Sequence, residues 1–539
     1  MRVQQVLDAV LAVSASLKGS PTAEERQRVV ADACCAGLSA TLPGKVLFPG
    51  RAPYTFTEAN DHRWSTTAIL SPSCIVQPDD TADVSAAMQV LTSDVWSYPP
   101  ACPFAIKSGG HTPFAGANNI DDGIVIDLSH INSTIVSADR KIVSIGPGST
   151  WQAAANTLNG TGIGIPTGRC PSTGVGGVTL GGGISFSAPR VGFAADNVLN
   201  YEIVLANGTV LNCNYTSHPS LYKALKGGGS NFGIVTRFDF AAFAQPSLWS
   251  GGVPLPADEQ GTHMVLKAMH DFTRYHSWLT SFAFGSMFSF NKTRVAAPAG
   301  SWNNIVYSGN LLTSLPLPAF PITVQGQTHK VRITDILSKM DLADILAESA
   351  DPFPWGYRNY LATIAFANDL PTLKRAHDIT VDIYDGVKDR VKGEMEWLFA
   401  YEPLPTLFSK HSRAKGGNVL GLDREKRDLI LMQLAPRWTD AADDPIMQAT
   451  AREWVEKVGE YAKSVGKGSG FVYYNYADGF QDPIASYGEE NVVFMREVAR
   501  EYDPRGVFQK ALRGGFKIPG MDGVEGEDRV EGTTEKDEL

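Results

Sequence analysis

Residues 107–112 read Lys-Ser-Gly-Gly-His-Thr, residues 168–177 read Gly-Arg-Cys-Pro-Ser-Thr-Gly-Val-Gly-Gly, and residues 181–183 are three further glycines. Glycine weakens a strand, so this many glycines in strand-like sequence indicate backbone that lies close against another group. Consecutive glycine N–H groups form concave nests that hold phosphate oxygens. The stretch therefore predicts a site for a large anionic cofactor, and the alternative is a set of tight turns.

A Rossmann dinucleotide site is another interpretation of these glycines, and the sequence disfavours it. Its fingerprint needs a strand, Gly-x-Gly-x-x-Gly, a helix and an acidic residue about twenty positions further on. Residues 181–183 are followed by Ile-Ser-Phe-Ser-Ala-Pro, which is a poor start for a helix.

Two nucleophilic side chains stand in the glycine turns, His111 after Gly109-Gly110 and Cys170 before Pro171. In this frame the sequence resembles the berberine-bridge-enzyme-like branch of the vanillyl-alcohol-oxidase flavoproteins, over nearly the whole chain. Further markers of the resemblance are Trp64, Gly-Gly-Gly-Ser-Asn-Phe-Gly-Ile-Val-Thr at 227–236, Tyr-Tyr-Asn-Tyr-Ala-Asp at 473–478, and Tyr-Asp-Pro at 502–504.

The resemblance implies an α+β fold. A PCMH-type FAD-binding domain of two small α/β subdomains would be joined to a substrate domain with a large antiparallel sheet covered by helices. It also implies FAD held by two covalent bonds, from His111 to the flavin 8α carbon and from Cys170 to flavin C6. The other residues that it carries over to the cofactor are Lys107, Ser108, Gly109, Gly110, Thr112, Gly116, Thr173, Gly174, Gly176, Gly177, Gly182, Gly183, Gly233, Ile234, Val235 and Asn475.

Two positions depart from the family's pattern. Lys107 stands where the family often has Arg, and a lysine donates to a phosphate as a point charge rather than as a fork. Thr173 stands where the family commonly has Val or Leu, at a position that helps to decide whether oxygen reaches the flavin.

Residues 470–476 are predicted to form a strand, in which Tyr473 shares a face with Asn475 and Tyr476 lies on the other face. In the family a Tyr of this strand acts as the catalytic base and the Asn lies beside the flavin. Tyr476 is the first choice for the base and Tyr473 is the alternate. A phenol with a pKa of about 10 needs a cationic neighbour or a hydrogen bond to act as a base near neutral pH. An ordinary tyrosine-rich strand is the structural alternative.

The composition excludes several classes of function. The chain has 539 residues, of which 43% are hydrophobic and 19% charged, as in a globular protein of two or three domains. A net charge of −10 and the lack of a basic, aromatic-rich cluster argue against nucleic acid as a partner. No apolar run is long enough to span a membrane. The histidines show no metal-binding motif and there is no Gly-x-Ser-x-Gly, so neither a metal nor a hydrolase is predicted.

The cysteines predict disulfides near the N-terminus. With Cys170 given to the flavin, the resemblance implies bridges that tie the N-terminal helix to the flavin domain. Four cysteines allow three pairings. Because Cys34 and Cys35 are adjacent, each is expected to pair with Cys74 or Cys102 rather than with its neighbour.

Three signals bear on the compartment. The C-terminal Lys-Asp-Glu-Leu resembles an endoplasmic-reticulum retrieval signal. The N-terminus is a poor signal peptide, because Asp8 interrupts a short apolar core. Sequons for N-glycosylation stand at Asn132, Asn159, Asn207, Asn214 and Asn291. We expect the secretory pathway, either the lumen of the endoplasmic reticulum or secretion.

The order of these motifs predicts the organisation of the chain, which we expect to be a monomer. The expected segments are a helical clasp (1–65), the FAD-binding domain (66–241), the substrate domain (242–465), a segment that returns to the FAD domain (466–518) and a disordered acidic tail (519–539). Among the expected helices are 83–92, 151–159, 221–225, 335–349, 371–388 and 489–501. Among the expected strands are 104–107, 142–147 and 429–434, a hairpin at 201–212, and 124–128, whose β-branched residues are typical of a buried strand. Around Phe288 and Phe399 aromatic residues alternate with other residues, which predicts half-buried strands. Thr22-Ala23-Glu24-Glu25 is a capping box, which predicts the start of a helix in the clasp.

The predicted function is that of an FAD-dependent oxidase. It would take a hydride from an alcohol, hemiacetal or amine-type carbon of an oligosaccharide or specialised metabolite, and O2 would reoxidise it with release of H2O2. The alternative is a flavin-containing cyclase or dehydrogenase of secondary metabolism with little oxygen reactivity.

Overall fold

The structure of the protein, a computed structural model, describes most of the chain. The described residues are 22–51, 55–93, 102–256, 259–274, 282–291, 300–307, 319–324, 327–332, 338–349 and 354–521. Residues 1–21 of the expected clasp and residues 522–539 of the expected tail lie outside them.

Two sheets carry the glycine turns. Their strands are β1 (Val46–Leu47), β2 (Cys74–Val76), β3 (Phe104–Lys107), β4 (Ile124–Asp127), β5 (Thr134–Val136), β6 (Ile142–Ile145), β8 (Val198–Val204), β9 (Val210–Asn214) and β10 (Ile234–Ala241). The first sheet has the order β1-β2-β4-β3, with β2, β4 and β3 parallel. The second is antiparallel, with the order β5-β6-β10-β8-β9. Every residue of β4 is buried, which confirms the prediction from its β-branched sequence.

Helices and two short strand pairs complete the framework. The helices around these sheets are α2 (Ala23–Thr41), α3 (Thr55–Asp61), α4 (Thr81–Leu91), α5 (Trp151–Leu158), α6 (Val175–Leu180), α7 (Ala188–Val191), α8 (Pro219–Ala224), α16 (Glu489–Tyr502) and α17 (Val507–Lys510). The short pairs are β7 (Ile163–Gly164) with β11 (Phe243–Ala244), and β15 (Ala319–Val324) with β16 (Gln327–Arg332). Helix α6 was not predicted, because its sequence contains two glycines and so has weak helix propensity.

A nine-stranded sheet forms the other half of the molecule. Its strands are β12 (Leu248–Pro256), β13 (Phe282–Asn291), β14 (Gly300–Tyr307), β17 (Ser338–Met340), β18 (Arg358–Asn359), β19 (Ala362–Ala367), β20 (Met395–Leu404), β21 (Leu429–Leu434) and β22 (Arg437–Trp438). The main path runs β17-β12-β14-β13-β20-β21-β19, and every pairing is antiparallel. Nearby helices are α9 (Glu259–Thr273), α11 (Leu342–Glu348), α12 (Leu370–Val387), α13 (Thr406–Ala414), α14 (Asp444–Ser464) and α15 (Pro483–Ser486).

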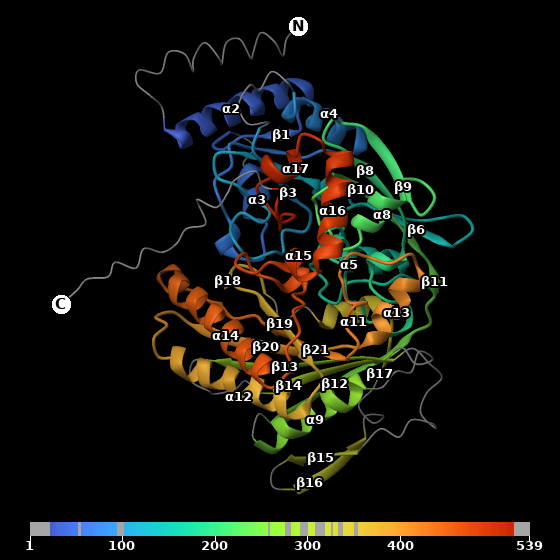
Figure 1. The fold of residues 1–539 in the computed structure, drawn as a ribbon, viewed down its shortest axis with the longest axis vertical. Helices are drawn as coiled ribbons and strands as arrows, with labels where there is room; N and C mark the ends of the chain where they lie inside the picture. Colours follow the sequence, from blue (N-terminus) through green and yellow to red (C-terminus); the bar gives the residue numbers. More distant parts are fainter. Residues whose placement is uncertain are drawn as a thin grey trace, which may run out of the picture.

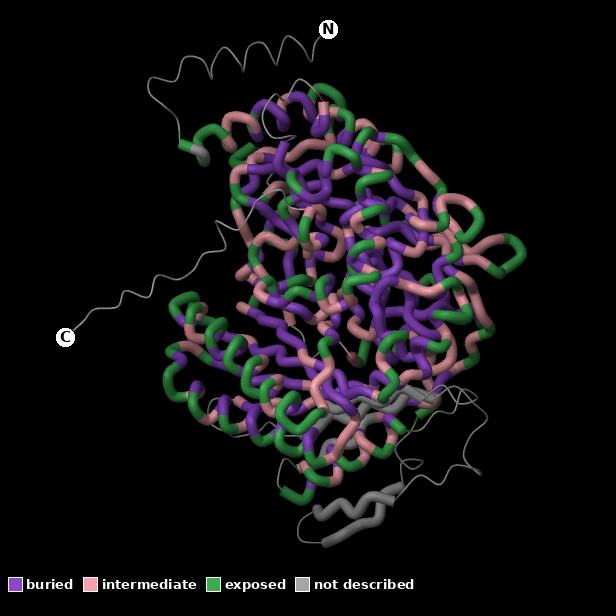
Figure 2. Tube along the Cα trace, in the orientation of Figure 1, coloured by how far each residue is buried: buried purple, intermediate pink, exposed green. Residues whose placement is uncertain are grey.

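The two faces of this large sheet have different partners. Helices α9, α12 and α14 cover one face, and the glycine-bearing half lies on the other (Figure 1). On the helix-covered face the alternating aromatics form a core, in which Phe288 and Phe399 stack with their ring centroids 5.2 Å apart. Figure 2 colours the chain by burial, and the residues of β20 and β21 are mostly buried. The predicted period-two pattern is confirmed, and it leaves the intervening side chains facing the glycine turns. No helix within the described ranges is both long and apolar enough to cross a membrane.

Helix α2 forms the expected clasp at one end of the molecule (Figure 1). The predicted capping box is confirmed, because the Thr22 hydroxyl accepts a hydrogen bond from Glu25 N and the Glu25 carboxylate accepts one from Thr22 N. The apolar side of the helix packs against α4 through buried residues such as Leu38.

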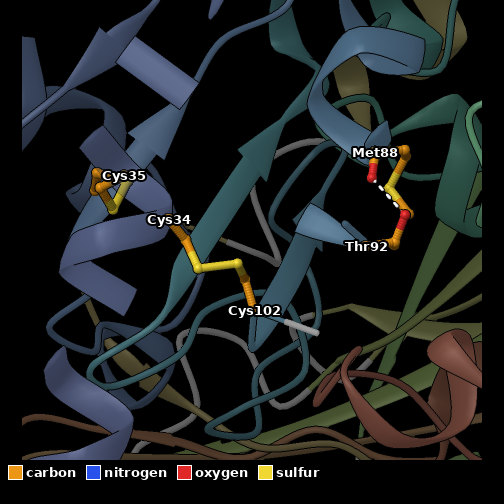
Figure 3. Close-up of a disulfide and its surroundings, with 6 residues drawn as sticks. Cys34, Cys35, Met88, Thr92 and Cys102 are labelled. Carbon is orange, nitrogen blue, oxygen red and sulfur yellow. Dashed lines mark hydrogen bonds between the residues drawn. A yellow bond between two sulfur atoms is a disulfide. The ribbon is translucent and has the colours of Figure 1, made fainter. Parts of the chain in front are cut away.

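Two disulfides fix the clasp to the first sheet. Cys34 bonds to Cys102 (Figure 3), and Cys35 bonds to Cys74 in β2. The expectation that neighbouring cysteines take separate partners is confirmed, and the structure chooses between the pairings that the sequence left open. The bridges thus anchor α2 both to β2 and to the chain that leads into β3.

Loss of one bridge should lower stability. The double variant Cys35→Ala/Cys74→Ala should lose about 2–5 kcal/mol of unfolding free energy, because an open loop gives the unfolded chain more conformational freedom. Urea denaturation measures the change. The matched control is Cys213→Ala, since Cys213 is a buried cysteine without a bridge, and it should lose clearly less. Equal urea midpoints for the wild type and the double variant would contradict the prediction.

The helix predicted at 335–349 is wrong at residues 338–340, and its residues 335–337 lie outside the described part of the chain. Residues 338–340 form strand β17 and pair with Leu248–Ser250 of β12. The helix α11 begins only at Leu342, after Asp341. Pairing with the edge of the sheet satisfies backbone groups that the local sequence alone would assign to a helix.

The strand predicted at 470–476 is also wrong. Tyr474–Tyr476 form a 3-10 turn, closed by a hydrogen bond of 3.1 Å from Tyr476 N to Tyr473 O. Side chains of this segment bond to the glycine-bearing half instead of a neighbouring strand, as Asn475 Nδ2 does to Val178 O at 3.0 Å. The turn also brings the rings of Tyr473 and Tyr476 together, with centroids 4.9 Å apart, so they do not lie on opposite faces.

Candidate active site

A large cavity lies between the glycine turns and the 473–477 segment. It holds about 1170 Å³ of empty space, counting the part open to solvent. Most of the predicted cofactor residues line it. They are Ser108, Gly109, Gly110, His111, Thr112, Thr173, Gly174, Gly176, Gly177, Gly233, Ile234, Val235 and Asn475. The structure therefore gathers residues from four separate parts of the sequence around one space.

Five predicted cofactor residues lie outside the cavity lining, and Lys107 is the clearest correction. Its ammonium is buried and bonds to Asp127 Oδ2 at 3.1 Å, so it is committed to an ion pair rather than to a phosphate. Gly182 packs against Leu420, and Gly183 packs against Ala194. Gly116 is the fourth, and it has a positive φ of 85°. The fifth is Cys170, whose Sγ lies 3.7 Å from Nε2 of the lining residue His111.

Close contact between the two glycine turns explains part of the glycine pattern. A Cβ on Gly109 would lie 2.4 Å from Gly174 N, and a Cβ on Gly174 would lie 2.4 Å from Gly109 N. Only glycine fits at both positions, because real Cβ atoms do not approach so closely. By contrast, a Cβ on Gly177 would meet nothing within 4 Å. The sequence analysis assigned all these glycines to cofactor binding. The structure shows that Gly109 and Gly174 also allow the two turns to pack against each other.

The His111 turn follows strand β3. Gly110 has a φ of 68°, and its carbonyl accepts a hydrogen bond from Trp64 N at 3.0 Å. The imidazole of His111 stacks on Trp64, with centroids 4.4 Å apart and planes 9° from parallel. Burial lowers the pKa of His111 to about 3, so the ring is neutral and one nitrogen carries a free lone pair. His111 is therefore a competent nucleophile.

The Cys170 turn is docked on the start of helix α5. Trp151 N donates to Thr173 O at 3.1 Å, and Gln152 N donates to Pro171 O at 3.1 Å. These N–H groups belong to the first turn of the helix and have no partner within it. The Thr173 hydroxyl also donates to Cys170 O at 2.7 Å. The cysteine is therefore held on a rigid support.

The two nucleophiles meet where His111 lines the cavity. Cys170 Sγ lies 3.7 Å from His111 Nε2 and 3.5 Å from Ser172 Oγ. Burial raises the pKa of the Cys170 thiol, which therefore keeps its proton until a base or a reacting partner removes it. Among the described residues, no cluster of His, Cys, Asp and Glu side chains is suited to a metal ion.

A polar triad stands beside Cys170. Arg169 Nη2 donates to Tyr476 Oη at 2.5 Å and to Glu402 Oε1 at 2.6 Å, and Tyr476 Oη donates to the same carboxylate oxygen at 3.0 Å. The expected cationic neighbour of Tyr476 is therefore confirmed. Burial raises the pKa of Tyr476 well above its ordinary value, and the charge of Arg169 opposes that rise. The phenol is protonated, with its proton directed at Glu402.

Glu402 was not identified from the sequence. It lies on β20, its side chain is buried, and its Oε2 has no hydrogen-bond partner in the part of the chain that the structure describes. A buried carboxylate with a free oxygen is costly, which favours a functional role. The available signal was an acidic residue that directly follows the apolar and aromatic run 397–401 of this strand.

Tyr473, the alternate base, is anchored differently. Its side chain is buried, and its hydroxyl accepts hydrogen bonds from Ile184 N at 2.9 Å and from Asn475 Nδ2 at 3.0 Å. It thereby orients Asn475, which lines the cavity. This geometry favours Tyr476 over Tyr473 as the base.

The sequence of this chain resembles that of known flavoproteins. Residues 72–214 match a family model described as an FAD binding domain. The FAD-dependent monooxygenase sdcF of Emericella nidulans is 37% identical over 91% of this chain and 99% of its own length. The chain belongs to the berberine-bridge-enzyme-like flavoproteins. This member of the family is an FAD-dependent oxidoreductase.

Solved structures share the fold of this berberine-bridge-enzyme-like protein. Glucooligosaccharide oxidase from Acremonium strictum, described with a 6-S-cysteinyl, 8α-N1-histidyl FAD, is 17% identical with a TM-score of 0.66, covering 91% of this chain and 98% of its own. 6-Hydroxy-D-nicotine oxidase from Arthrobacter nicotinovorans is 21% identical with a TM-score of 0.67, and the match covers 88% of this chain and 98% of that enzyme. These likenesses confirm the predicted α+β architecture with a PCMH-type domain.

Proposed function

We propose that FAD occupies the large cavity and is bonded to both His111 and Cys170. The glycine-lined wall, and the pair formed by the lining residue His111 and the neighbouring Cys170, suit a flavin dinucleotide. Thr112 would contribute a polar group to the cofactor, and Asn475 would contact it from the 473–477 segment. The neutral imidazole of His111 is in the protonation state that covalent attachment requires.

We propose further that the protein is an oxidase acting on an alcohol, hemiacetal or amine-type carbon. Bound FAD supplies the chemistry of a two-electron acceptor, taking a hydride at N5 and returning the electrons to O2 as H2O2. The observation that carries this proposal is the triad of Arg169, Glu402 and Tyr476 next to Cys170. Such a triad has the groups needed to remove a proton from the substrate.

In the proposed reaction, Tyr476 and Glu402 act together on that proton. Tyr476 Oη accepts the proton of the substrate hydroxyl or amine while its own proton passes to Glu402 Oε1. Arg169 keeps the shared oxygen atoms in place and balances the charge of the carboxylate. This relay does not require a free tyrosinate, which agrees with the raised pKa of Tyr476.

A dehydrogenase or cyclase with little oxygen reactivity is the second candidate. Thr173 favours it, because a hydroxyl-bearing residue lines the cavity where the family commonly has Val or Leu. The relatives named monooxygenases favour the use of oxygen.

Flavin bleaching separates the two candidates. The enzyme is mixed without air with a panel of alcohols, sugars and amines, and loss of the yellow absorption identifies a hydride donor. Air is then admitted. Rapid return of the colour together with H2O2 is the result expected of an oxidase, whereas persistent bleaching supports the dehydrogenase. If no member of the panel bleaches the flavin, hydride transfer from these substrate classes is refuted.

We also propose that the protein matures in the secretory pathway. The two disulfides require an oxidising compartment, and the side chains of Asn132, Asn159 and Asn207 are exposed as glycosylation requires. Treatment of the native protein with an N-glycosidase should lower its mass. Unmodified peptides at all three sites, together with free thiols at the four bridging cysteines, would refute the assignment.

A further inference from the structure

The face of the large sheet that looks toward the cavity can be read from strand register. Glu402 on β20 belongs to the triad, so Ala400 and Leu398 share its face. Ala400 pairs with Met287 on β13 and with Gln433 on β21. Directly paired residues lie on the same face of a sheet, so one surface spans these three strands.

Apolar side chains dominate one end of this surface. A separate cluster lies between the sheet and the His111 turn, apart from the cores of the two halves. We call it the apolar wall, and it consists of Trp64, Trp355, Met287, Leu361, Leu398 and Ala435. Leu361 lines the cavity, Trp64 stacks on His111, and Trp355 presents its ring edge-on to His111 at 6.2 Å. The apolar wall therefore borders the space beside the proposed flavin attachment.

Few polar groups on this face are free to bind a ligand. The Thr363 hydroxyl donates to Met432 O at 3.0 Å, so it is already engaged. The Ser289 hydroxyl donates to Glu396 and is engaged as well. Within the described residues of this face, the groups with hydrogen-bonding capacity to spare are the triad around Glu402, the buried side chain of Gln433, and Nη1 of Arg437 beside Glu396. An oligosaccharide presents a hydroxyl on nearly every carbon, and each buried hydroxyl without a partner would cost binding energy.

We propose that the substrate is a predominantly apolar aromatic molecule with one or two oxygen functions, rather than an oligosaccharide. This inference rests on the proposed function, because it assumes that the substrate lies between the triad and the apolar wall. The oxidisable hydroxyl would meet Tyr476, and the aromatic body would pack on Trp355 and Met287. Tryptophan rings and a thioether make favourable contacts with flat aromatic partners.

Binding to the holoenzyme tests this proposal independently of turnover. 2-Naphthalenemethanol and cellobiose serve as probes, and perturbation of the flavin absorption spectrum reports each dissociation constant. The naphthalene probe should bind, and cellobiose should cause no change at equal concentration. Trp355→Ala and the near-isosteric Met287→Gln should each weaken binding of the naphthalene probe by about 10- to 200-fold.

The matched control is Tyr357→Ala, which removes an aromatic ring two positions away that stacks under Arg437. It should leave binding of the naphthalene probe unchanged. The proposal is overturned if cellobiose binds more tightly, if neither probe binds, or if both wall variants bind like the wild type. Flavin bleaching separates a failure of this proposal from a failure of the proposed function. If the naphthalene probe binds but no member of the panel bleaches the flavin, only hydride transfer is refuted. Bleaching by cellobiose refutes only the substrate class.

Discussion

Replacement of Tyr476 by phenylalanine is expected to slow substrate-dependent bleaching of the flavin by about 10²–10⁴-fold, the usual loss for a missing general base. The variant removes one hydroxyl, which accepts from Arg169 and donates to Glu402. The ring remains, so the fold and the yellow colour should survive. Stopped-flow absorbance without air measures the rate, with a substrate identified by the panel above.

Two further variants test which groups accept the substrate proton. Glu402→Gln keeps the volume of the side chain but removes the proton acceptor, so it should cause a loss of similar size. Tyr473→Phe should have a much smaller effect, because the hydroxyl of Tyr473 is engaged with Ile184 N and Asn475 Nδ2. If Tyr476→Phe and Glu402→Gln both bleach at the wild-type rate, the proton acceptor lies elsewhere.

The second large effect concerns cofactor retention. Acid-denatured wild-type protein should stay yellow, and one proteolytic flavopeptide should contain both His111 and Cys170. His111→Ala and Cys170→Ala should each keep acid-stable flavin through the remaining bond. The double variant should release all its FAD into the acid supernatant, because no covalent bond is left.

Absorption and mass spectrometry of the pellet and the supernatant measure this outcome. Ser172→Ala is the matched control, since it removes a hydroxyl 3.5 Å from Cys170 Sγ without removing a linking atom. It should retain the flavin after acid treatment. Release of free FAD from the wild type would refute the covalent attachment altogether.

Local signals in the sequence predicted much of the fold. The buried run of β4, the capping box at Thr22 and the alternating aromatics around Phe288 each specify their structure within a few neighbouring residues. The His111 and Cys170 turns were identified in the same way, because each is a compact motif. The structure adds that the side chains of the two turns face each other.

Only part of the proton-accepting site could be predicted from the sequence, because its residues are far apart along the chain. Arg169 and Glu402 are separated by 233 positions, and Arg169 and Tyr476 by 307. The pattern around Tyr476 is that of a strand, yet its side chains bond to distant residues and a tight turn results. Lys107 was misassigned for a related reason, since its buried partner Asp127 belongs to the next strand of the sheet.

The contact between Gly109 and Gly174 has a consequence for anyone who redesigns the protein. Because neither backbone has room for a methyl group, a larger residue at either position must push one turn away from the other. His111 and Cys170 would then separate together, so damage at one turn is transmitted to the other. Directed evolution that seeks to loosen one linkage while sparing its partner should therefore avoid both glycines and search the flanking positions instead.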